Sequence, residues 1–148
     1  LNACLDGPLM SSPIERVRIE LTGGKFNEVD SSETAFSIAS SIAVNNGLRK
    51  AKAVIMEPIM LISIISPEDF VGEIIGDINS KRGRIENIRN LSLKQEITAQ
   101  VPMSELFSYS TRLRSISQGR ADYTMEYLKH EKTPANIQEK ILKKVRGF

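Results

Sequence analysis

The chain has 148 residues, and its 20 Lys and Arg residues against 18 Asp and Glu residues give a net charge of +2 at pH 7. Hydrophobic residues at 41% and charged residues at 26% are close to globular averages, which excludes a disordered or collagen-like chain. One Cys and one His exclude an internal disulfide and a thiolate zinc cage, and they argue against a metalloenzyme or a Ser-His-Asp triad.

Three features bear on where the protein works. The longest apolar run, residues 59–65, is far shorter than the ~20 residues that span a bilayer, so we expect no membrane partner. The lone Cys4 fits a reducing cytosol. A start at Leu1 without a signal-peptide pattern predicts that the sequence belongs to a longer protein.

The first region predicts a hairpin. Residues 14–21 alternate between apolar and charged side chains, which is typical of a half-buried strand. Gly23 and Gly24 supply a turn, and residues 25–29 predict the short return strand.

A helix follows the hairpin. Asp30 is its predicted N-cap and Glu33 the capping-box partner, and the helix ends either near residues 45–47 or at Ala51. Its apolar stripe consists of Phe36, Ala39, Ile42 and Ala43. Two short strands and one helix cannot close a core alone, so we expect this region to pair with chain upstream.

The second region predicts a complete small domain. Residues 58–65 are apolar on both faces, as in a buried central strand, and residues 66–69 (SPED) are typical of a helix start with Ser66 as N-cap. Gly83 is the predicted left-handed C-cap of that helix. The other predicted elements are strands at residues 84–90 and 95–101, a helix from Leu106 to Gly119, a strand at residues 121–128 and a basic final helix at residues 135–145. The order βαββαβ, followed by a helix, is that of a ferredoxin-like fold.

The sequence contains no catalytic constellation. It lacks a P-loop, a dinucleotide fingerprint, a C-x-x-C pair and an H-E-x-x-H helix. The acidic residues Glu57, Glu68, Asp69 and Glu73 are interpreted as the acidic start of a helix, and His130 as a solvated loop residue. We therefore expect no catalytic residue, no metal and no cofactor in this chain.

Basic residues are the more informative group. Lys81, Arg82 and Arg84 lie at the end of the first predicted helix of this region. The second predicted helix and its exit carry Arg112, Arg114 and Arg120. Such residues can bind phosphates, or they can simply form solvated faces. Residues 58–65 and 95–101 contain no aromatic side chain, so base stacking on the sheet is not expected and any RNA contact should come from loops and helix ends.

Several segments together resemble the C-terminal end of elongation factor G, a translational GTPase. They are residues 7–9 (GPL), 29–36 (VDSSETAF), 57–60 (EPIM), 75–83 (IGDINSKRG), 101–115 (VPMSELFSYSTRLRS) and 118–127 (QGRADYTMEY). The resemblance implies that residues 1–53 are the second half of the family's fourth domain and that residues 54–148 are its fifth domain. The implied fold is α+β: a partial ribosomal-protein-S5-like βαβ domain, then a ferredoxin-like βαββαβ sandwich and a C-terminal helix.

The resemblance also implies a function. The parent protein would hydrolyse GTP with Mg²⁺ in an N-terminal domain outside this sequence and promote translocation of tRNA and mRNA in the cytoplasm, so this part alone would be no enzyme and would carry no cofactor. Its partner would be the ribosome, through ribosomal RNA, the tRNA–mRNA at the decoding site and the base of the large-subunit stalk, with the isolated part monomeric. One loop would face the tRNA–mRNA: Gly23, Gly24, Lys25, Phe26, Asn27 and Glu28. The six basic residues above are the candidates for ribosomal RNA contact, or in part for bracing the two domains.

Three alternatives stay open. Asn27 stands where members of the family commonly carry a histidine, which leaves room for a paralogue acting in ribosome recycling or in ribosomal protection from an antibiotic. A free-standing RNA-binding or interaction module is a second alternative. An independent enzyme on a ferredoxin-like fold is the third, and the missing constellation disfavours it.

Overall fold

A computed structural model describes residues 4–147. The chain divides into two units, which are described separately below. The sheet unit comprises Met56–Lys132, and the helical unit comprises the residues up to Ile55 together with those from Thr133 onward.

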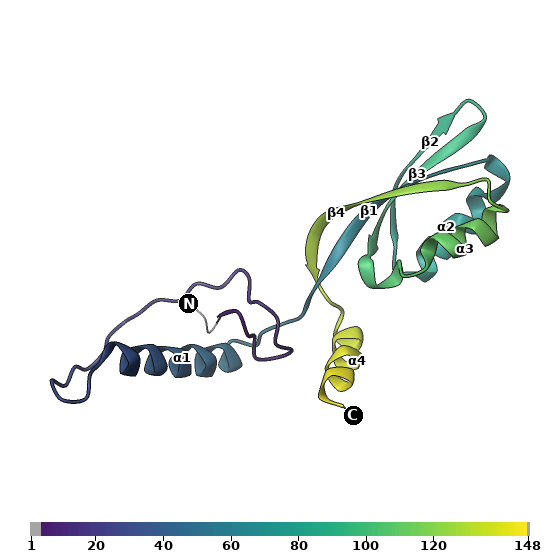
Figure 1. Ribbon diagram of the computed structural model, residues 1–148. Coiled ribbons are helices and arrows are strands. Elements are labelled where there is room, and N and C mark those ends of the chain that lie inside the picture. The colour runs from purple at the N-terminus through teal and green to yellow at the C-terminus, as the bar shows by residue number, and fades with distance from the viewer. Residues whose placement is uncertain (1–3, 148) are drawn as a thin grey trace. The chain divides into compact units, whose positions relative to one another are not determined.

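The sheet unit contains a four-stranded antiparallel sheet in the order β2-β3-β1-β4 (Figure 1). Its strands are β1 (Met56–Ser66), β2 (Arg84–Leu91), β3 (Lys94–Pro102) and β4 (Asp122–Lys132). β1 pairs with β3 on one side and with β4 on the other, which confirms the buried central strand expected from its apolar sequence. The βαββαβ order predicted from the sequence is confirmed as well.

Two helices cover one face of this sheet. They are α2 (Val71–Ser80) and α3 (Tyr109–Ser117), and Figure 1 shows both on the same side of the strands. The buried side chains of the core are Met60, Ile62, Ile64, Val71, Ile74, Ile78, Ile97, Ala99, Val101, Leu106, Tyr109, Leu113, Ile116 and Ala121. Burying one such large apolar side chain stabilises a fold by about 1.5–3 kcal/mol, so this cluster accounts for the closure of the unit.

The start of α2 differs from the prediction in its capping. The helix is preceded by a 3₁₀ turn, Glu68–Phe70, and no side chain caps either element. Ser66, predicted as the N-cap, instead donates its hydroxyl to the carbonyl of Pro67 at 3.1 Å. Pro67 stands at the N-cap, and its carbonyl accepts from the N–H of Phe70 at 3.2 Å, so the chain enters the helix through a 3₁₀ turn without a side-chain cap.

The end of α2 corrects the role of Gly83. The left-handed residue there is Arg82, with φ of 56°. Gly83 donates its N–H to the carbonyl of Ile78 at 2.9 Å, and a Cβ on Gly83 would lie 2.4 Å from Ile78 Cγ2. Glycine is therefore required by close approach to the helix and not by a left-handed φ.

The predicted hairpin of the helical unit is wrong. Among the described residues before β1 there is no strand, and the backbone of residues 14–29 forms no ladder. The alternating apolar residues Val17, Ile19 and Leu21 are all exposed. A two-stranded hairpin is marginal in water without a surface to pack on, and here none covers these side chains.

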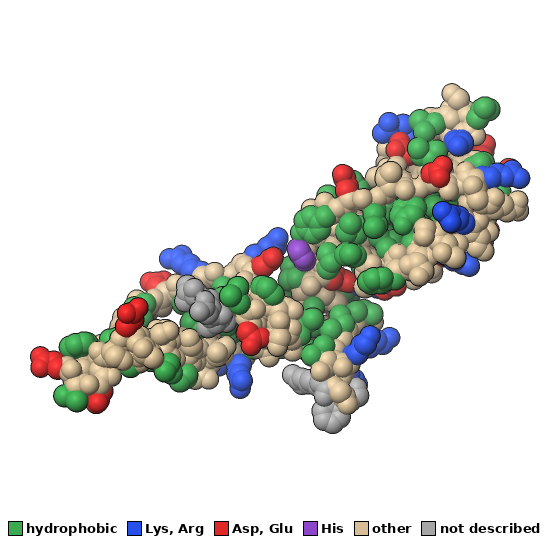
Figure 2. Space-filling view, viewed as in Figure 1, with side chains coloured by type: hydrophobic (Ala, Val, Ile, Leu, Met, Phe, Trp, Pro, Cys, Tyr) green, Lys and Arg blue, Asp and Glu red, His purple; other side chains and the backbone are tan. Residues whose placement is uncertain are grey.

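Helix α1 (Glu33–Lys50) forms as predicted but begins later. Its N-cap is Ser32, whose Oγ accepts from the N–H of Ala35 at 3.1 Å, and not Asp30. The helix passes through residues 45–47, which supports the longer of the two predicted lengths. Leu48 is its buried residue, while the predicted apolar stripe is largely exposed. Figure 2 shows hydrophobic side chains on the visible surface of this segment.

Helix α4 (Ala135–Arg146) is the predicted C-terminal helix. Gln138 accepts from the N–H of Ile55 through Oε1 at 2.8 Å, and Thr133 donates its N–H to the carbonyl of Ile55 at 2.9 Å. These bonds tie the segment before β1 to the segment after β4. Among residues 4–147, no helix combines the length and apolar character needed to cross a membrane.

Candidate nucleic-acid interface

The loop of residues 23–28 is exposed along its whole length. Asn27 organises its end: Oδ1 accepts from the N–H of Val29 at 2.9 Å, and the Asn27 N–H donates to Ser31 Oγ at 2.8 Å. The Ser31 N–H returns a bond to the Asn27 carbonyl at 2.9 Å. This is the local turn that Asn side chains favour, and it commits the amide oxygen while its NH₂ group can still donate outward.

An aromatic pair links the same loop to α1. The rings of Phe26 and Phe36 are nearly parallel, at 8°, with centroids 6.4 Å apart. Both rings remain partly exposed. The sequence alone does not indicate this pair, because Phe26 lies in the loop and Phe36 in the helix, ten positions apart.

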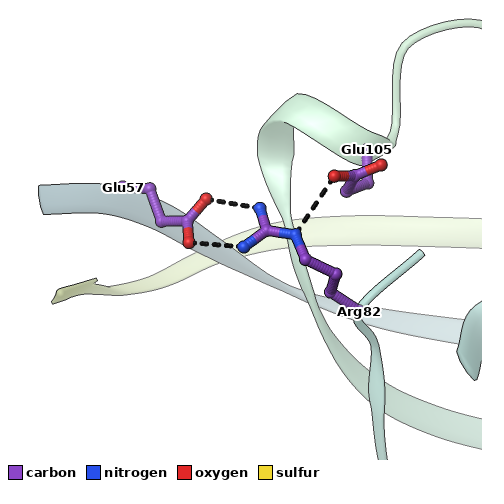
Figure 3. Close-up of polar contacts among 3 residues, drawn as sticks. All are labelled: Glu57, Arg82 and Glu105. Carbon is purple, nitrogen blue, oxygen red and sulfur yellow. Dashed lines mark hydrogen bonds and ion pairs between the residues drawn. The ribbon is translucent and has the colours of Figure 1, made fainter. Parts of the chain in front are cut away.

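Arg82 is held inside the sheet unit by two carboxylates. Its Nη1 and Nη2 donate to Glu57 at 2.9 and 2.7 Å, and its Nε donates to Glu105 at 3.1 Å (Figure 3). The hydrogen bond with Glu57 is the largest cause that raises the pKa of Arg82, and Glu105 adds to it. Glu57 is therefore an internal partner of Arg82 on β1, and not part of an acidic helix start as the sequence suggested.

Arg112 is held differently. Its Nε donates to Asp77 Oδ1 at 3.0 Å, which joins α3 to α2. The Asp77 side chain is only 7% exposed, whereas that of Arg112 is 55% exposed. This ion pair thus has one buried end and one end in solvent.

The remaining basic candidates lie around the unit. Lys81 Nζ lies 5.9 Å from the ring centroid of Tyr109, and Arg120 Cζ lies 5.6 Å from that of Phe70. Both contacts have the geometry of cation–π interactions. Arg84, Arg114 and Arg120 are exposed, as is Arg112.

Arg112 and Arg114 do not share one face of α3. Arg112 and Arg114 are two positions apart on α3, which places them about 200° apart around the helix axis. In Figure 2 the Lys and Arg side chains on the visible face of the sheet unit are dispersed among acidic and polar ones. The structure therefore pairs Arg82 and Arg112 with carboxylates and leaves Arg84, Arg114 and Arg120 exposed.

Other chemistry-bearing residues do not converge. His130 lies within β4 and not in a loop, and its Nδ1 is 2.7 Å from the hydroxyl of Tyr127. Within residues 4–147, no group of three or more His, Cys, Asp or Glu residues could hold a metal ion.

The comparisons with known proteins cover almost the whole chain. The family model described as "Elongation factor G, domain IV" matches residues 2–52, and the one described as "Elongation factor G C-terminus" matches residues 54–141. Elongation factor G 2 of Desulfotalea psychrophila is 45% identical over 142 residues, which is 96% of this chain and 20% of that protein. Elongation factor G of Thermotoga petrophila is 45% identical over 143 residues, or 97% of this chain and 21% of that protein.

A solved structure agrees with these matches. The crystal structure of a Thermus thermophilus protein has a TM-score of 0.89 and 28% sequence identity, covering 99% of this chain and 22% of that one. The described fold and these matches define a domain IV segment joined to an α+β C-terminal domain of a translation factor. The chain belongs to the elongation factor G family and corresponds to its C-terminal region, and it spans about one fifth of the length of the relatives that it matches.

Proposed function

We propose that this chain is the ribosome-binding C-terminal part of a translational GTPase that promotes GTP-dependent translocation of tRNA and mRNA in the cytoplasm. The observation that carries the proposal is the match of both family models in order, at residues 2–52 and 54–141. GTP and Mg²⁺ would bind elsewhere in the whole protein. The contribution of this part would be mechanical, through contact with the ribosome.

Within this proposal the chain has two working regions, divided near residue 53. The loop of residues 23–28 faces the tRNA–mRNA at the decoding site, and its exposure together with the turn at Asn27 supports that role. The sheet unit lies at the base of the large-subunit stalk, where its exposed arginines meet ribosomal RNA. Arg82 and Lys81 would act there mainly by shaping the surface, because the structure engages them with neighbouring side chains.

The test uses the full-length factor that contains this chain. Lys25→Ala is expected to slow single-turnover translocation several-fold, because a phosphate-facing cation in the loop is removed. Lys50→Ala is the matched control, since it removes an exposed cation at the other end of α1, about 27 Å along an 18-residue helix. Equal effects of both changes would refute the assignment of the loop.

Complementation distinguishes the paralogues. Rescue of a strain depleted of its translocase by the full-length factor supports the proposal. A factor that does not rescue, but splits ribosomes into subunits or relieves antibiotic inhibition, would establish the recycling or protection alternative suggested by Asn27.

A further inference from the structure

Two arginines of the sheet unit are held by carboxylates, but they differ in how many guanidinium nitrogens these contacts use. Arg82 uses Nε, Nη1 and Nη2, and its side chain is 25% exposed. Arg112 forms its ion pair through Nε alone and remains mostly in solvent. An arginine fixed at Nε still carries two terminal nitrogens whose N–H groups match the oxygens of a phosphate. Arg112 therefore has the geometry of a held but available guanidinium.

The carboxylate that holds Arg112 is nearly buried, with the Asp77 side chain 7% exposed. Asp77 lies in the last turn of α2, and its Oδ2 is buried without a hydrogen-bond partner. The Tyr109 hydroxyl on α3 is also buried without a partner. Burial, followed by the charge of Asp77, raises the pKa of Tyr109, so the phenol stays protonated and can donate. The Tyr109 hydroxyl and Asp77 Oδ2 are thus a buried donor and a buried acceptor, each without a hydrogen-bond partner.

We propose that Asp77 is a positioning residue that orients Arg112 so that its terminal N–H groups bind a phosphate of ribosomal RNA. The proposal rests on the proposed function, because it takes ribosomal RNA as the ligand. Fixing the side chain before binding lowers the entropy lost when the contact forms. Arg112 is then a specific anchor, while a free surface arginine would add only general attraction.

The proposal predicts the direction in which RNA affinity changes when the charge of Asp77 is removed. Asp77→Asn removes a negative charge close to Arg112, so general electrostatics predicts tighter binding to RNA. If Asp77 orients Arg112, the same change weakens binding. The two ideas therefore predict opposite directions for one substitution.

The experiment measures binding of the full-length factor to ribosomes with a non-hydrolysable GTP analogue, at several KCl concentrations. Arg112→Ala is expected to weaken binding about five- to tenfold and to reduce the slope of log affinity against log salt by about 0.7–1. Asp77→Asn is expected to weaken binding about two- to fivefold, since the contact survives but is no longer fixed. Arg112→Lys keeps the charge and the salt slope but loses the fork, and its affinity falls between wild type and Arg112→Ala.

Arg89→Ala is the matched control. Arg89 is also an exposed arginine paired through Nε, with Glu96 Oε2 at 3.6 Å on β2 and β3, and it was not a candidate for RNA contact. Its removal is expected to leave affinity within twofold of wild type. An equal loss for Arg89→Ala and Arg112→Ala would overturn the proposal, because the effect would then be one of net charge.

Failure of this inference is separable from failure of the proposed function. A wild-type factor that does not bind ribosomes refutes both. A wild-type factor that binds, with Arg112→Ala binding equally well at the same salt slope, refutes only the positioning role. Asp77→Asn binding as tightly as wild type, or more tightly, refutes it too. Thermal unfolding of each variant identifies a folding defect. If Asp77→Asn is unstable, Arg112→Lys still tests the proposal, because it keeps the charge and would overturn the proposal by binding as tightly as wild type.

Discussion

The sheet unit and the residues before β1 use similar local patterns and reach different results. In the sheet unit, alternating residues such as Ile62 and Ile64 are completely buried between the sheet and two helices. Before β1, the alternating residues 17–21 are exposed and form no strand. The comparison teaches that alternation becomes a strand only where a neighbouring strand and a covering layer exist, because the backbone and the apolar side chains both need partners.

The largest expected effect comes from comparing alanine substitutions of two isoleucines, one buried and one exposed. Ile64→Ala is expected to lower the free energy of unfolding of the sheet unit by about 2–5 kcal/mol, since it leaves a cavity among fully buried side chains. Ile42→Ala in α1, where the side chain is 56% exposed, is expected to change the free energy of unfolding of the helical unit by less than about 0.5 kcal/mol. Denaturant unfolding of the chain measures both. A similar cost at the two positions would show that α1 has a packing partner in solution.

Hydrogen exchange tests the contrast along the backbone. Amides of β1 and β3 are expected to exchange at least about a hundredfold more slowly than those of α1, because only the former open with the buried core. The measurement is made on the whole chain at one pH. Equal protection in both regions would contradict the difference between the two units.

The ion pairs of Arg82 give a smaller expected effect. Arg82→Gln is expected to destabilise the sheet unit by about 1–3 kcal/mol, because Glu57 is left nearly buried without its partner. This range is below that of a fully buried pair, since the Arg82 side chain is partly exposed.

This stabilisation should not depend on pH in the neutral range. The pKa of Arg82 is raised above an already alkaline value, so the stabilisation is fully present below the pKa of the unfolded state and is lost only as the pH rises through the folded-state pKa. The difference between wild type and Arg82→Gln should therefore be the same at pH 6 and pH 9. A difference that vanishes at pH 9 would disprove this account.

The smallest effect concerns the start of α1. Ser32→Ala is expected to cost about 1 kcal/mol of helix stability, since it removes the acceptor for the Ala35 N–H. Asp30→Ala, at the position that the sequence favoured, should cost less. Circular dichroism of the two variants on thermal unfolding ranks them, and the reverse order would restore Asp30 as the cap.

The elements of the sheet unit could be predicted because local pattern and tertiary packing agree there. The start of α1 could not, since Asp30 and Ser32 both satisfy a capping signal and only the backbone conformation chooses between them. The sequence predicted correctly that glycine is needed at residue 83, just after α2. It did not predict why glycine is needed there, because the close approach of Ile78 arises only in the folded structure. At Gly83 the sequence signal marked the right place and packing supplied the reason, whereas at the start of α1 the signal marked Asp30, two residues before the actual cap Ser32.

The candidate interface could be predicted only as a set of charges. Arg82 and Glu57 are 25 positions apart, and Arg112 and Asp77 are 35 positions apart. No local spacing rule connects residues at such distances, because strand register and helix packing bring them together. The sequence therefore identified which arginines exist, whereas the fold determines which of them are neutralised and which remain available.

The pairing of β1 with β4 has a mechanical consequence. Met56 and Lys132, the first and last residues of the sheet unit, are partners in the same antiparallel ladder. A pulling force applied between these two residues would break the hydrogen bonds of the ladder one after another from this end, and would not load all of them at once. Tension arriving through the flanking chain would thus reach the bonds that Ile55 makes with Thr133 and Gln138 first, and then the first rung of the ladder.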